Sequence, residues 1–537
     1  MPEGSTPPRQ PIARAVDAVV IGAGFGGLYM LHRLRELGLS LQGFEAGGGV
    51  GGTWYWNRYP GARCDLPSLY YAYTWSESLS REWRWSERYA AQPEILAYAN
   101  HVTDRFDLRG LIAFGTRVLS AVFDDVSGLW TVETDRGDRV TARWCVMATG
   151  CLSTPRAPQF PGEESFRGPR YHTGLWPHEP VDLRGLRVGV IGTGSSGIQA
   201  IPRIADEARQ VTVFQRTPNF SLPAQNGPLG DAEIADYWAR RPKYLQALKA
   251  GLPGVTAHAA GAPVPPLEEQ RRVYEQMWAV GGPILIASFP NLLTDEGVNA
   301  AAADFVREKI AEAVRDPQIA ARLSPHDHPI GTKRICVDTG YYETFNRPNV
   351  ELVDVRAAPI EAITPDGLRT SERAYALDAI VYATGFDAVT GALLAIDIRG
   401  AGGRALREAW ADGPHAYLGL AVAGFPNLFI LAGPGSPSVL SNMMVSLEEH
   451  VDWVSDCVAH MRAQGLSRID PQASAQDAWM AQVKALADNS LFPRANSWYV
   501  GANVPGKPRV FTAYIGGGYR QTCEAVAANG YEGFALA

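Results

Sequence analysis

Cysteine is scarce in this sequence, and the few residues present form no framework. Six cysteines are spread over 537 residues, with no C-x-x-C motif and no close Cys/His cluster. This spacing argues against a disulfide scaffold, a structural metal site and a paired redox dithiol. We therefore expect free buried thiols, no bound metal and a reducing, cytoplasmic location.

Long apolar runs and an excess of positive charge are also missing. No uninterrupted stretch of ~18 apolar residues occurs, so no membrane-spanning helix is expected. The net charge of -7 offers no basic surface that would attract nucleic acid or anionic lipid. Residues 1–15 are proline-rich without an apolar core, which predicts a disordered tail and not a signal peptide. Small molecules are the expected partners, and the sequence does not indicate an oligomeric state.

The chain does contain two glycine-rich turns, and the first lies near its start. A short apolar run, residues 17–21, predicts a buried parallel strand. It leads into a G-x-G-x-x-G turn at residues 22–27 and then into apolar residues at helical spacing. A second strand, residues 39–44, ends in Glu45, whose carboxylate can accept hydrogen bonds from ribose hydroxyls. This order of elements indicates a dinucleotide site where the backbone approaches a pyrophosphate.

The second glycine-rich turn, residues 192–197, follows a predicted strand at residues 187–191 and repeats the pattern. Each turn opens a segment that closes on a strand followed by Ala-Thr-Gly, at Gly150 and again at Gly385. Two dinucleotide-binding domains in one chain explain this repeat, and they imply two different nucleotides. The strand after the second turn leads to Arg216 instead of an acid, and an arginine there suits the 2′-phosphate of NADPH. A solvated arginine at a strand end is the alternative.

Residues 226–328 break the dinucleotide pattern. Apolar residues recur there at helical spacing, around residues 234–248 and 305–314. The expected fold is therefore α/β, with two Rossmann-like dinucleotide-binding domains and a helical insertion in the second. The insertion would help to shape the roof of an active site, although plain packing explains it equally well.

Several further segments carry a resemblance to a known family. Residues 166–177 read F-x-G-x-x-x-H-x-x-x-W-P, and residues 51–65 read G-G-x-W-x-x-x-x-Y-P-G-x-x-x-D. The chain resembles the Baeyer–Villiger monooxygenases in these two segments and in residues 331–346 and 497–507. The resemblance extends over nearly all of residues 16–520. The phenylacetone and cyclohexanone enzymes belong to this family of flavoproteins, which insert one oxygen atom of O2 beside a ketone carbonyl.

The resemblance implies an FAD- and NADPH-dependent enzyme that converts a ketone to an ester or lactone. NADPH would reduce FAD, and the reduced flavin would take up O2 to give a C4a-peroxyflavin that attacks the ketone. Carried over by position, Arg334 is the catalytic cation that stabilises developing negative charge, and Asp65 orients it. Arginine does not titrate near neutrality, so we expect an electrostatic role and no general base. Without the motif, Asp65 would be interpreted as a solvated loop carboxylate.

The resemblance also assigns binding residues. The residues expected to bind FAD are Gly22, Gly24, Phe25, Gly27, Glu45, Gly52, Thr53, Trp54, Asp65 and Tyr71. The residues expected to bind NADP are Gly192, Thr193, Gly194, Ser195, Ser196, Gly197, Arg216, Thr217, Lys333, Arg334 and Trp498. The substrate pocket would be formed by Leu66, Ser438, Val439, Leu440 and Met443. A connector between the two nucleotide domains would comprise Phe166, Gly168, His172, Trp176 and Pro177.

A division into domains follows from these assignments: FAD-binding residues 16–150 and 387–537, NADP-binding residues 151–225 and 329–386, and the insertion, residues 226–328. Because the connector joins the two nucleotide domains, we expect His172 and Trp176 to fix the geometry that lets the nicotinamide reach the flavin. A general-base role for His172 is the alternative. For Trp498, the alternative is an ordinary core tryptophan.

Other functions fit parts of the pattern. An N- or S-hydroxylating flavin monooxygenase shares both nucleotide sites, but usually has Tyr or Phe in place of Trp176 and lacks Pro177. A flavin disulfide reductase needs a dithiol, which the scattered cysteines do not supply, and a non-catalytic nucleotide sensor would need no substrate. Residues 66–71 depart from the acid-containing stretch often found in the smaller-ring enzymes, so the sequence does not identify the ketone.

Overall fold

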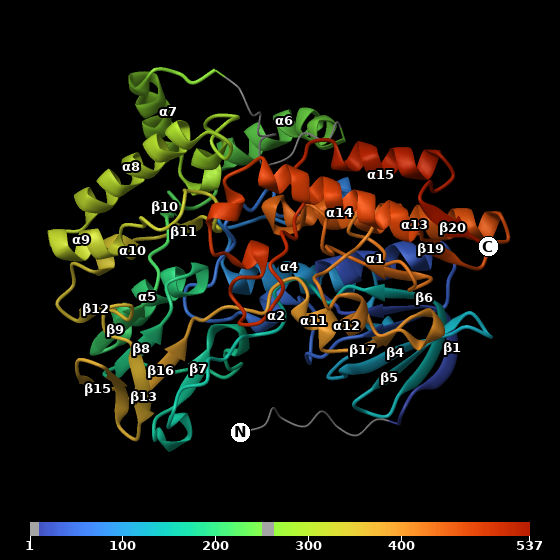
Figure 1. The fold of residues 1–537 in the computed structure, drawn as a ribbon, viewed down its shortest axis with the longest axis horizontal. Helices are drawn as coiled ribbons and strands as arrows, with labels where there is room; N and C mark the ends of the chain where they lie inside the picture. Colours follow the sequence, from blue (N-terminus) through green and yellow to red (C-terminus); the bar gives the residue numbers. More distant parts are fainter. Residues whose placement is uncertain (1–9, 250–262) are drawn as a thin grey trace.

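The computed structural model describes residues 10–249 and 263–537. Two lobes, each built on a sheet with parallel strands, lie side by side, and helices from the middle and the end of the chain cover them from one side (Figure 1). Each lobe contains one of the two glycine-rich turns. The α/β class expected from the sequence is confirmed.

The larger sheet contains the first glycine-rich turn. Strand β1, Ala13–Ile21, pairs in parallel with β2, Leu41–Phe44, on one side and with β6, Arg139–Met147, on the other. The strand order is β17-β4-β5-β6-β1-β2-β3, with β18 beside β6. The remaining strands are β3 (Ile112–Ala113), β4 (Val118–Asp124), β5 (Leu129–Thr134), β17 (Asp397–Arg399) and β18 (Leu428–Ile430). The C-terminal part of β1, residues 18–21, is almost fully buried, as a strand segment covered on both faces must be.

The predicted disordered tail, residues 1–15, is too long. Residues 1–9 lie outside the described residues, but β1 already begins at Ala13, which pairs with Arg139. The backbone N–H of Ile12 donates to Asp138 Oδ1 at 2.6 Å, and Ile12 O accepts from the Arg139 N–H at 2.8 Å. Backbone pairing with the start of β6 therefore orders residues that apolar content alone does not mark as a strand.

The smaller sheet contains the second glycine-rich turn and is entirely parallel, in the order β12-β9-β8-β16-β7. Its strands are β7 (Arg170–His172), β8 (Arg187–Ile191), β9 (Gln210–Gln215), β12 (Val350–Asp354) and β16 (Ala379–Tyr382). The connector predicted from residues 166–177 thus supplies an edge strand, β7, which continues the sheet next to β16.

Helices begin directly after each glycine-rich turn and cover the sheets. Helix α1, Phe25–Glu36, packs against α13, Met443–Ala463, which in turn packs against α15, Tyr519–Ala528. In the smaller lobe, α5 spans Ser195–Glu207. The other helices outside the predicted insertion are α2 (Thr53–Trp56), α3 (Glu77–Glu82), α4 (Gln92–Arg105), α10 (Tyr341–Thr344), α11 (Gly391–Leu394), α12 (Leu406–Ala409) and α14 (Ala473–Asp488).

The segment predicted to be helical, residues 226–328, contains α6 (Asp231–Lys249), α7 (Leu267–Val280), α8 (Glu296–Ala313) and α9 (Pro317–Leu323), and lies over the smaller lobe in Figure 1. At its base β10, Ser221–Pro223, pairs in parallel with β11, Cys336–Asp338. Two small antiparallel sheets complete the described strands: β13 (Ile360–Thr364), β14 (Gly367–Thr370) and β15 (Ala374–Ala376), and β19 (Ile469–Pro471) with β20 (Phe534–Leu536).

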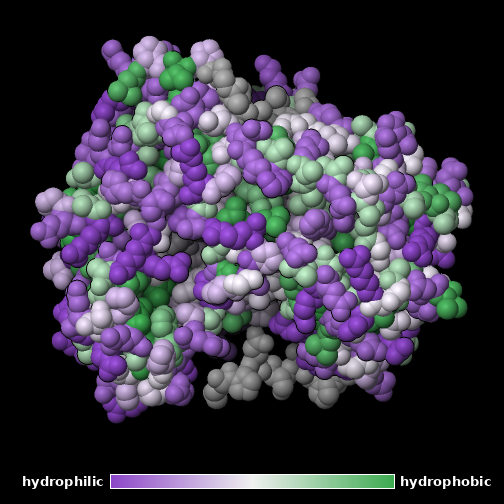
Figure 2. All heavy atoms as spheres, in the orientation of Figure 1, coloured by the Kyte–Doolittle hydropathy of each residue, from purple (hydrophilic) through white to green (hydrophobic). Residues whose placement is uncertain are grey.

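The surface is mixed in character. On the face drawn in Figure 2, hydrophilic residues are distributed broadly and apolar residues appear in small groups. Within residues 10–249 and 263–537, no helix combines the length and the apolar character needed to cross a membrane.

Candidate functional site

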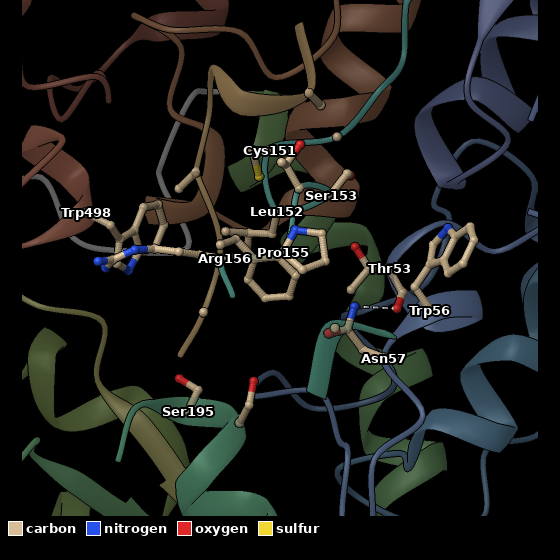
Figure 3. Close-up of a pocket in the computed structure, with 18 of the residues that line it drawn as sticks. Thr53, Trp56, Asn57, Cys151, Leu152, Ser153, Pro155, Arg156, Ser195 and Trp498 are labelled. Atoms are coloured by element: carbon tan, nitrogen blue, oxygen red, sulfur yellow. Dashed lines mark hydrogen bonds between the residues drawn. The ribbon is translucent and has the colours of Figure 1, made fainter. Parts of the chain in front are cut away.

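A cavity of about 1310 Å³ lies between the two lobes, and both glycine-rich turns line it (Figure 3). Ligand pockets for one small molecule typically measure ~300–1,000 Å³, so this cavity has room for more than one ligand. Of the residues predicted to bind nucleotides, all line the cavity except Gly27 and Gly197. A Cβ at Gly27 would lie 1.9 Å from Gly22 O, and one at Gly197 would lie 2.3 Å from Gly192 O. These two glycines let each helix pack closely onto its turn.

Glu45 closes the first turn at the end of β2. Its Oε2 accepts a hydrogen bond from the Ala23 N–H at 2.7 Å, and its Oε1 accepts from the Gly47 N–H at 2.7 Å. Burial raises the pKa of the Glu45 carboxyl, and these two backbone donors oppose that rise. The carboxylate is therefore held in a fixed orientation at the cavity wall, where its remaining lone pairs can accept further hydrogen bonds.

Aromatic side chains form the wall next to the first turn. Trp54, in the short helix α2, donates from Nε1 to the Tyr71 hydroxyl at 3.0 Å. The Tyr71 ring lies 6.1 Å from the Phe25 ring in an edge-to-face arrangement. Thr53 begins the same helix and also faces the cavity. Locked aromatic rings of this kind provide a rigid, apolar surface for a planar ligand.

Cationic residues gather beside the second turn. Arg216 and Lys333 line the cavity, and Thr217 O accepts a hydrogen bond from the Thr193 hydroxyl at 3.0 Å. Burial lowers the pKa of the Lys333 ammonium, Asp327 raises it, and repulsion from Arg356 and Arg216 lowers it further. Repulsion among cations at one end of a cavity indicates a site for an anion.

Arg356 belongs to this group, although the sequence gives no signal for it. Its guanidinium donates to the Thr217 hydroxyl at 2.9 Å and pairs with Asp327. Asp327 also contacts His328 Nδ1 at 2.7 Å. Burial raises the pKa of the Asp327 carboxyl, but Arg356 and His328 outweigh this effect and lower that pKa to about 2. Arg356 follows β12, far in sequence from the second turn, so only the fold reveals this contact.

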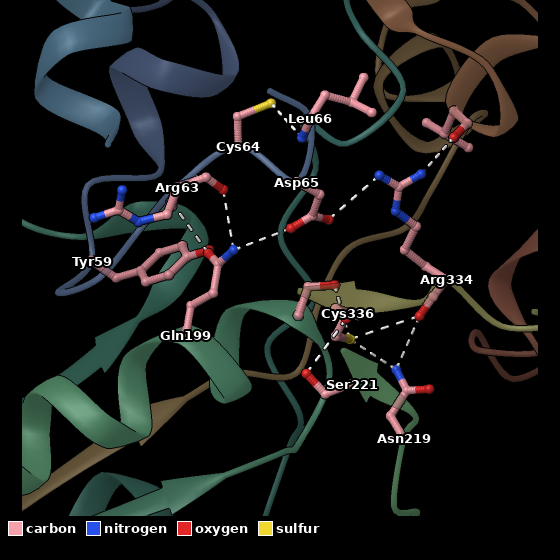
Figure 4. Close-up of polar contacts among 12 residues, drawn as sticks. Tyr59, Arg63, Cys64, Asp65, Leu66, Gln199, Asn219, Ser221, Arg334 and Cys336 are labelled. Carbon is pink, nitrogen blue, oxygen red and sulfur yellow. Dashed lines mark hydrogen bonds and ion pairs between the residues drawn. The ribbon is translucent and has the colours of Figure 1, made fainter. Parts of the chain in front are cut away.

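Asp65 and Arg334 meet in the middle of the cavity wall (Figure 4). Arg334 Nη2 donates to Asp65 Oδ2 at 3.4 Å, and Nη1 donates to the Val439 carbonyl at 3.0 Å. The two side chains are 14% and 31% exposed, for Asp65 and Arg334 respectively. Burial raises the pKa of the Asp65 carboxyl, and the positive charge of Arg334 opposes that rise. Burial alone would lower the pKa of the Arg334 guanidinium, but Asp65 and other neighbours raise its pKa overall. The structure thus brings together a fixed cation and the carboxylate predicted to orient it.

Gln199, which sequence analysis did not single out, contacts the same carboxylate. It lies in α5, and its Nε2 donates to Asp65 Oδ1 at 3.3 Å and to Arg63 O at 3.1 Å. Its Oε1 accepts from the Tyr59 hydroxyl at 2.8 Å and from the Arg63 N–H at 3.3 Å. The signal available in the sequence was its place two residues after the second glycine-rich turn, on the first turns of the helix.

None of the five residues predicted to form the connector lines the cavity. His172 Nδ1 accepts from the Gly174 N–H at 3.0 Å, and Nε2 lies 3.2 Å from Arg156 O and 3.3 Å from the Thr384 hydroxyl. Burial lowers the pKa of His172, so the ring is neutral at neutral pH, and the Nδ1 acceptor leaves the proton on Nε2. The other four predicted connector residues are buried or half-buried: Phe166, Gly168, Trp176 and Pro177.

The predicted substrate residues divide into two groups. Leu66, Val439 and Met443 line the cavity. Ser438 and Leu440 do not, because the 3-10 turn Ser438–Leu440 directs them inward: Ser438 is 2% exposed, and Leu440 packs against the main hydrophobic core. A contact of these two residues with the substrate stays a prediction.

A loop from the C-terminal part of the chain closes one side of the cavity. Trp498, in the 3-10 turn Trp498–Val500, and Asn503 both line it. The Asn503 side chain donates to Phe386 O at 2.7 Å, and Lys507 Nζ contacts Asp387 Oδ1 and Ala388 O at 2.5 and 2.7 Å. These contacts attach the loop to residues 386–388, which follow β16.

Comparison with protein families gives a match to part of the chain. A family model described as "Pyridine nucleotide-disulphide oxidoreductase" matches residues 19–226, which contain both glycine-rich turns. All six cysteines are free thiols within the described residues. The match therefore reflects the nucleotide-binding architecture, because a disulfide-reducing centre would need a paired dithiol.

Full-length relatives are more informative. The chain is 43% identical over 523 residues to a protein of Pseudooceanicola batsensis named "Baeyer-Villiger monooxygenase", and the match covers 96% of this chain and 95% of that protein. It is 51% identical to a solved structure, "Oxidized steroid monooxygenase bound to NADP", with a TM-score of 0.92 and coverage of 97% of this chain and 99% of the other. It is 42% identical to an OTEMO complex with FAD and NADP, with a TM-score of 0.93 and the same coverage.

Proposed function

Because this chain belongs to the Baeyer–Villiger monooxygenase family, we propose that the cavity between its lobes is the chamber in which FAD, NADPH and a ketone meet at Arg334. The protein is an FAD- and NADPH-dependent flavoprotein monooxygenase that inserts one oxygen atom of O2 beside the carbonyl of a ketone, giving an ester or lactone. The observation that carries the residue assignments is the Asp65–Arg334 pair in the wall between the two glycine-rich turns.

The first turn and the larger sheet fit FAD. The N-terminus of α1 points its free backbone N–H groups at the cavity, which suits a pyrophosphate, and Glu45 is oriented to accept from ribose hydroxyls. Trp54 and Tyr71 offer an apolar wall for the flavin ring. We assign residues 16–150 and 387–537 to the FAD-binding domain.

The second turn and the smaller sheet fit NADPH. The N-terminus of α5 serves the pyrophosphate, and the cations beside it, Arg216 and Lys333, suit the 2′-phosphate that distinguishes NADPH from NADH. We assign residues 151–225 and 329–386 to the NADP-binding domain, and residues 226–328 to a helical insertion in it. Trp498 stands at the cavity side of the C-terminal loop, where it would cover the bound nucleotide.

FAD and NADPH, when bound, supply hydride transfer and the activation of O2. The chain supplies a fixed positive charge and a dry wall around the reacting carbonyl. Arg334 stabilises the negative charge that develops on oxygen, and it needs no reorganisation because Asp65 and Val439 O hold both of its terminal nitrogens. Asp65 also keeps the guanidinium from being an uncompensated buried charge.

The ketone would lie against the apolar wall formed by Leu66, Val439 and Met443, next to Arg334. The relative with 51% identity is a steroid monooxygenase by its title. The apolar side chains beside the cation suit a cyclic ketone, and the similarity to a steroid monooxygenase favours a bulky one. Steroid ketones are therefore the first compounds to test.

The proposal is tested with a panel of ketones, incubated with the holoenzyme, NADPH and air and analysed by mass spectrometry. We expect a product that is one oxygen atom heavier than the ketone, with kcat/KM for a steroid ketone above that for cyclohexanone. An amine and a thioether serve as controls, since N- or S-hydroxylation is the competing activity. Oxidation of the amine or thioether without ester or lactone from any ketone would overturn the assignment of Arg334 and its pocket to ketone oxidation.

A further inference from the structure

Gln199 uses all the hydrogen-bonding capacity of its amide on one segment of the other lobe. Both of its Nε2 donors and two acceptor positions on Oε1 are occupied by groups of residues 59–65, at 2.8 to 3.3 Å (Figure 4). Gln199 itself lies in α5, which follows the second glycine-rich turn. The side chain therefore connects the second nucleotide site to the segment that ends in Asp65.

The backbone contact at the same place is unusually close. Gly61 has a φ of +84°, and a Cβ there would lie 2.4 Å from the carbonyl oxygen of Gln199. Only glycine combines this backbone conformation with this approach. Residues 59–65 therefore contact α5 in two ways: Gly61 packs against the helix backbone, and the Gln199 amide forms hydrogen bonds with the segment.

The Asp65 carboxylate lies between two side chains of the smaller lobe. Its Oδ1 accepts from Gln199 and its Oδ2 accepts from Arg334, at 3.3 and 3.4 Å. A carboxylate held at one oxygen only can rotate away from the guanidinium. With both oxygens engaged, its plane is set by Gln199, and its second oxygen is directed at Arg334.

We propose that Gln199 is a positioning residue, which fixes the orientation of Asp65 toward Arg334 and fastens residues 59–65 to α5. This inference rests on the proposed function, which gives Arg334 and Asp65 their roles. The two halves of the amide have different tasks: Oε1 holds the segment through Tyr59 and the Arg63 N–H, while Nε2 orients Asp65 and adds a hydrogen bond to Arg63 O.

The two halves can be separated by substitution. Gln199→Glu keeps acceptors for the Tyr59 hydroxyl and the Arg63 N–H, but it removes the donors to Asp65 and to Arg63 O and places a second carboxylate beside Asp65. Gln199→Ala removes both halves. Glu207→Gln is the control, because Glu207 is exposed at the C-terminal end of α5, about two turns beyond Gln199.

Two measurements on the FAD-loaded enzyme with NADP+ or NADPH distinguish the tasks. Hydrogen exchange of the Arg63 amide reports the fastening of the segment and needs no substrate. The ester or lactone formed per NADPH consumed, with kcat and KM measured separately, reports the orientation of Asp65.

We expect Gln199→Ala to speed exchange of the Arg63 amide and to lower product per NADPH by about tenfold. We expect Gln199→Glu to speed that exchange less than Gln199→Ala does, because the acceptors for Tyr59 and the Arg63 N–H remain. It should lower kcat by a similar factor, with the KM for NADPH unchanged. Glu207→Gln should change neither quantity.

Wild-type product yield and kcat in Gln199→Glu would overturn the positioning role, and wild-type exchange in Gln199→Ala would overturn the fastening role. Failure of the proposed function would appear differently, as absence of ester or lactone from any ketone with the wild-type enzyme. The exchange result stands apart from that outcome, because it requires no turnover.

Discussion

The Asp65 carboxylate and the Arg334 guanidinium lie 3.4 Å apart, although 269 positions separate them in the chain. Asp65 ends the aromatic segment after the first glycine-rich turn, and Arg334 precedes β11, at the base of the segment predicted as an insertion. The pair forms only when both lobes are in place. A cation held in this way acts on a charge that develops in the cavity, because it needs no rearrangement when the charge appears.

Replacing Arg334 with alanine should abolish ester formation while FAD stays bound. Loss of one preorganised stabilising contact typically costs ~10²–10³ in rate, and Arg334 contacts Val439, which lines the proposed ketone site. Arg334→Lys keeps a charge but cannot donate to both Asp65 and Val439 O from a planar fork, so we expect intermediate activity. Product mass and the visible flavin spectrum check the prediction. An alanine variant with near-wild-type ester yield would show that the charge lies elsewhere.

Replacing Arg216 with alanine should weaken NADPH use and leave NADH use nearly unchanged. A hydrogen bond to a charged group contributes ~1.5–3 kcal/mol, which corresponds to about a 10- to 100-fold change in affinity. Binding of NADP+ and of NAD+ is measured directly by titration with each variant. Arg356→Ala is a useful second variant, because Arg356 contacts Thr217 at the rim of this cation group. Equal losses for both nucleotides would contradict a 2′-phosphate contact.

Local sequence patterns located much of the site. The strand, turn and helix order around both glycine-rich turns is local, so periodicity and spacing predicted β8 with the bounds observed. Asp65 and Arg334 each occur inside a segment of fixed spacing that the resemblance aligned. These features depend on neighbours within a few residues, and such dependence is visible in a sequence.

Contacts made by the tertiary fold were not predictable in the same way. Gln199 and Asp65 are 134 positions apart, and nothing in either segment marks the other as its partner. The burial of Ser438 was not predictable either, because a short 3-10 turn, which has no strong sequence pattern, decides which way its side chain points. The start of β1 was missed because its partner strand, not its own composition, orders it.

His172 should act on the geometry of hydride transfer and not on proton transfer. Its ring is neutral, with Nδ1 accepting from Gly174 and Nε2 directed at Arg156 O, and neither nitrogen faces the cavity. His172→Ala should therefore slow the anaerobic reduction of the flavin by NADPH, measured by stopped-flow absorbance. His172→Gln, which can still reach Arg156 O, should recover part of the rate. An alanine variant that reduces the flavin normally and loses only oxygen insertion would favour the general-base alternative.

Glu448 should make the stability of the protein fall as the pH rises. Its carboxyl is buried in α13, where it accepts from the Thr74 N–H at 2.6 Å and contacts the Thr74 hydroxyl. Burial raises the pKa of Glu448 from 4.5 to about 8, donation from Thr74 lowers it, and the nearby Asp452 raises it. Between these two values the native state keeps a proton that the unfolded chain releases. The free energy of unfolding therefore decreases across that window, by up to ~1.4 kcal/mol per pH unit.

Replacing Glu448 with glutamine should remove this pH dependence, because the amide mimics the protonated carboxyl: its oxygen can accept from the Thr74 N–H and its nitrogen can donate to the Thr74 hydroxyl. We expect the melting temperature of Glu448→Gln, relative to wild type, to be higher at pH 8.5 than at pH 5.5 by several degrees. Glu361→Gln, at a glutamate that is 49% exposed, provides the control and should show no such change. The same difference between Glu448→Gln and wild type at both pH values would mean that Glu448 is ionised in the native protein, since only a carboxyl that keeps its proton on folding can produce the slope.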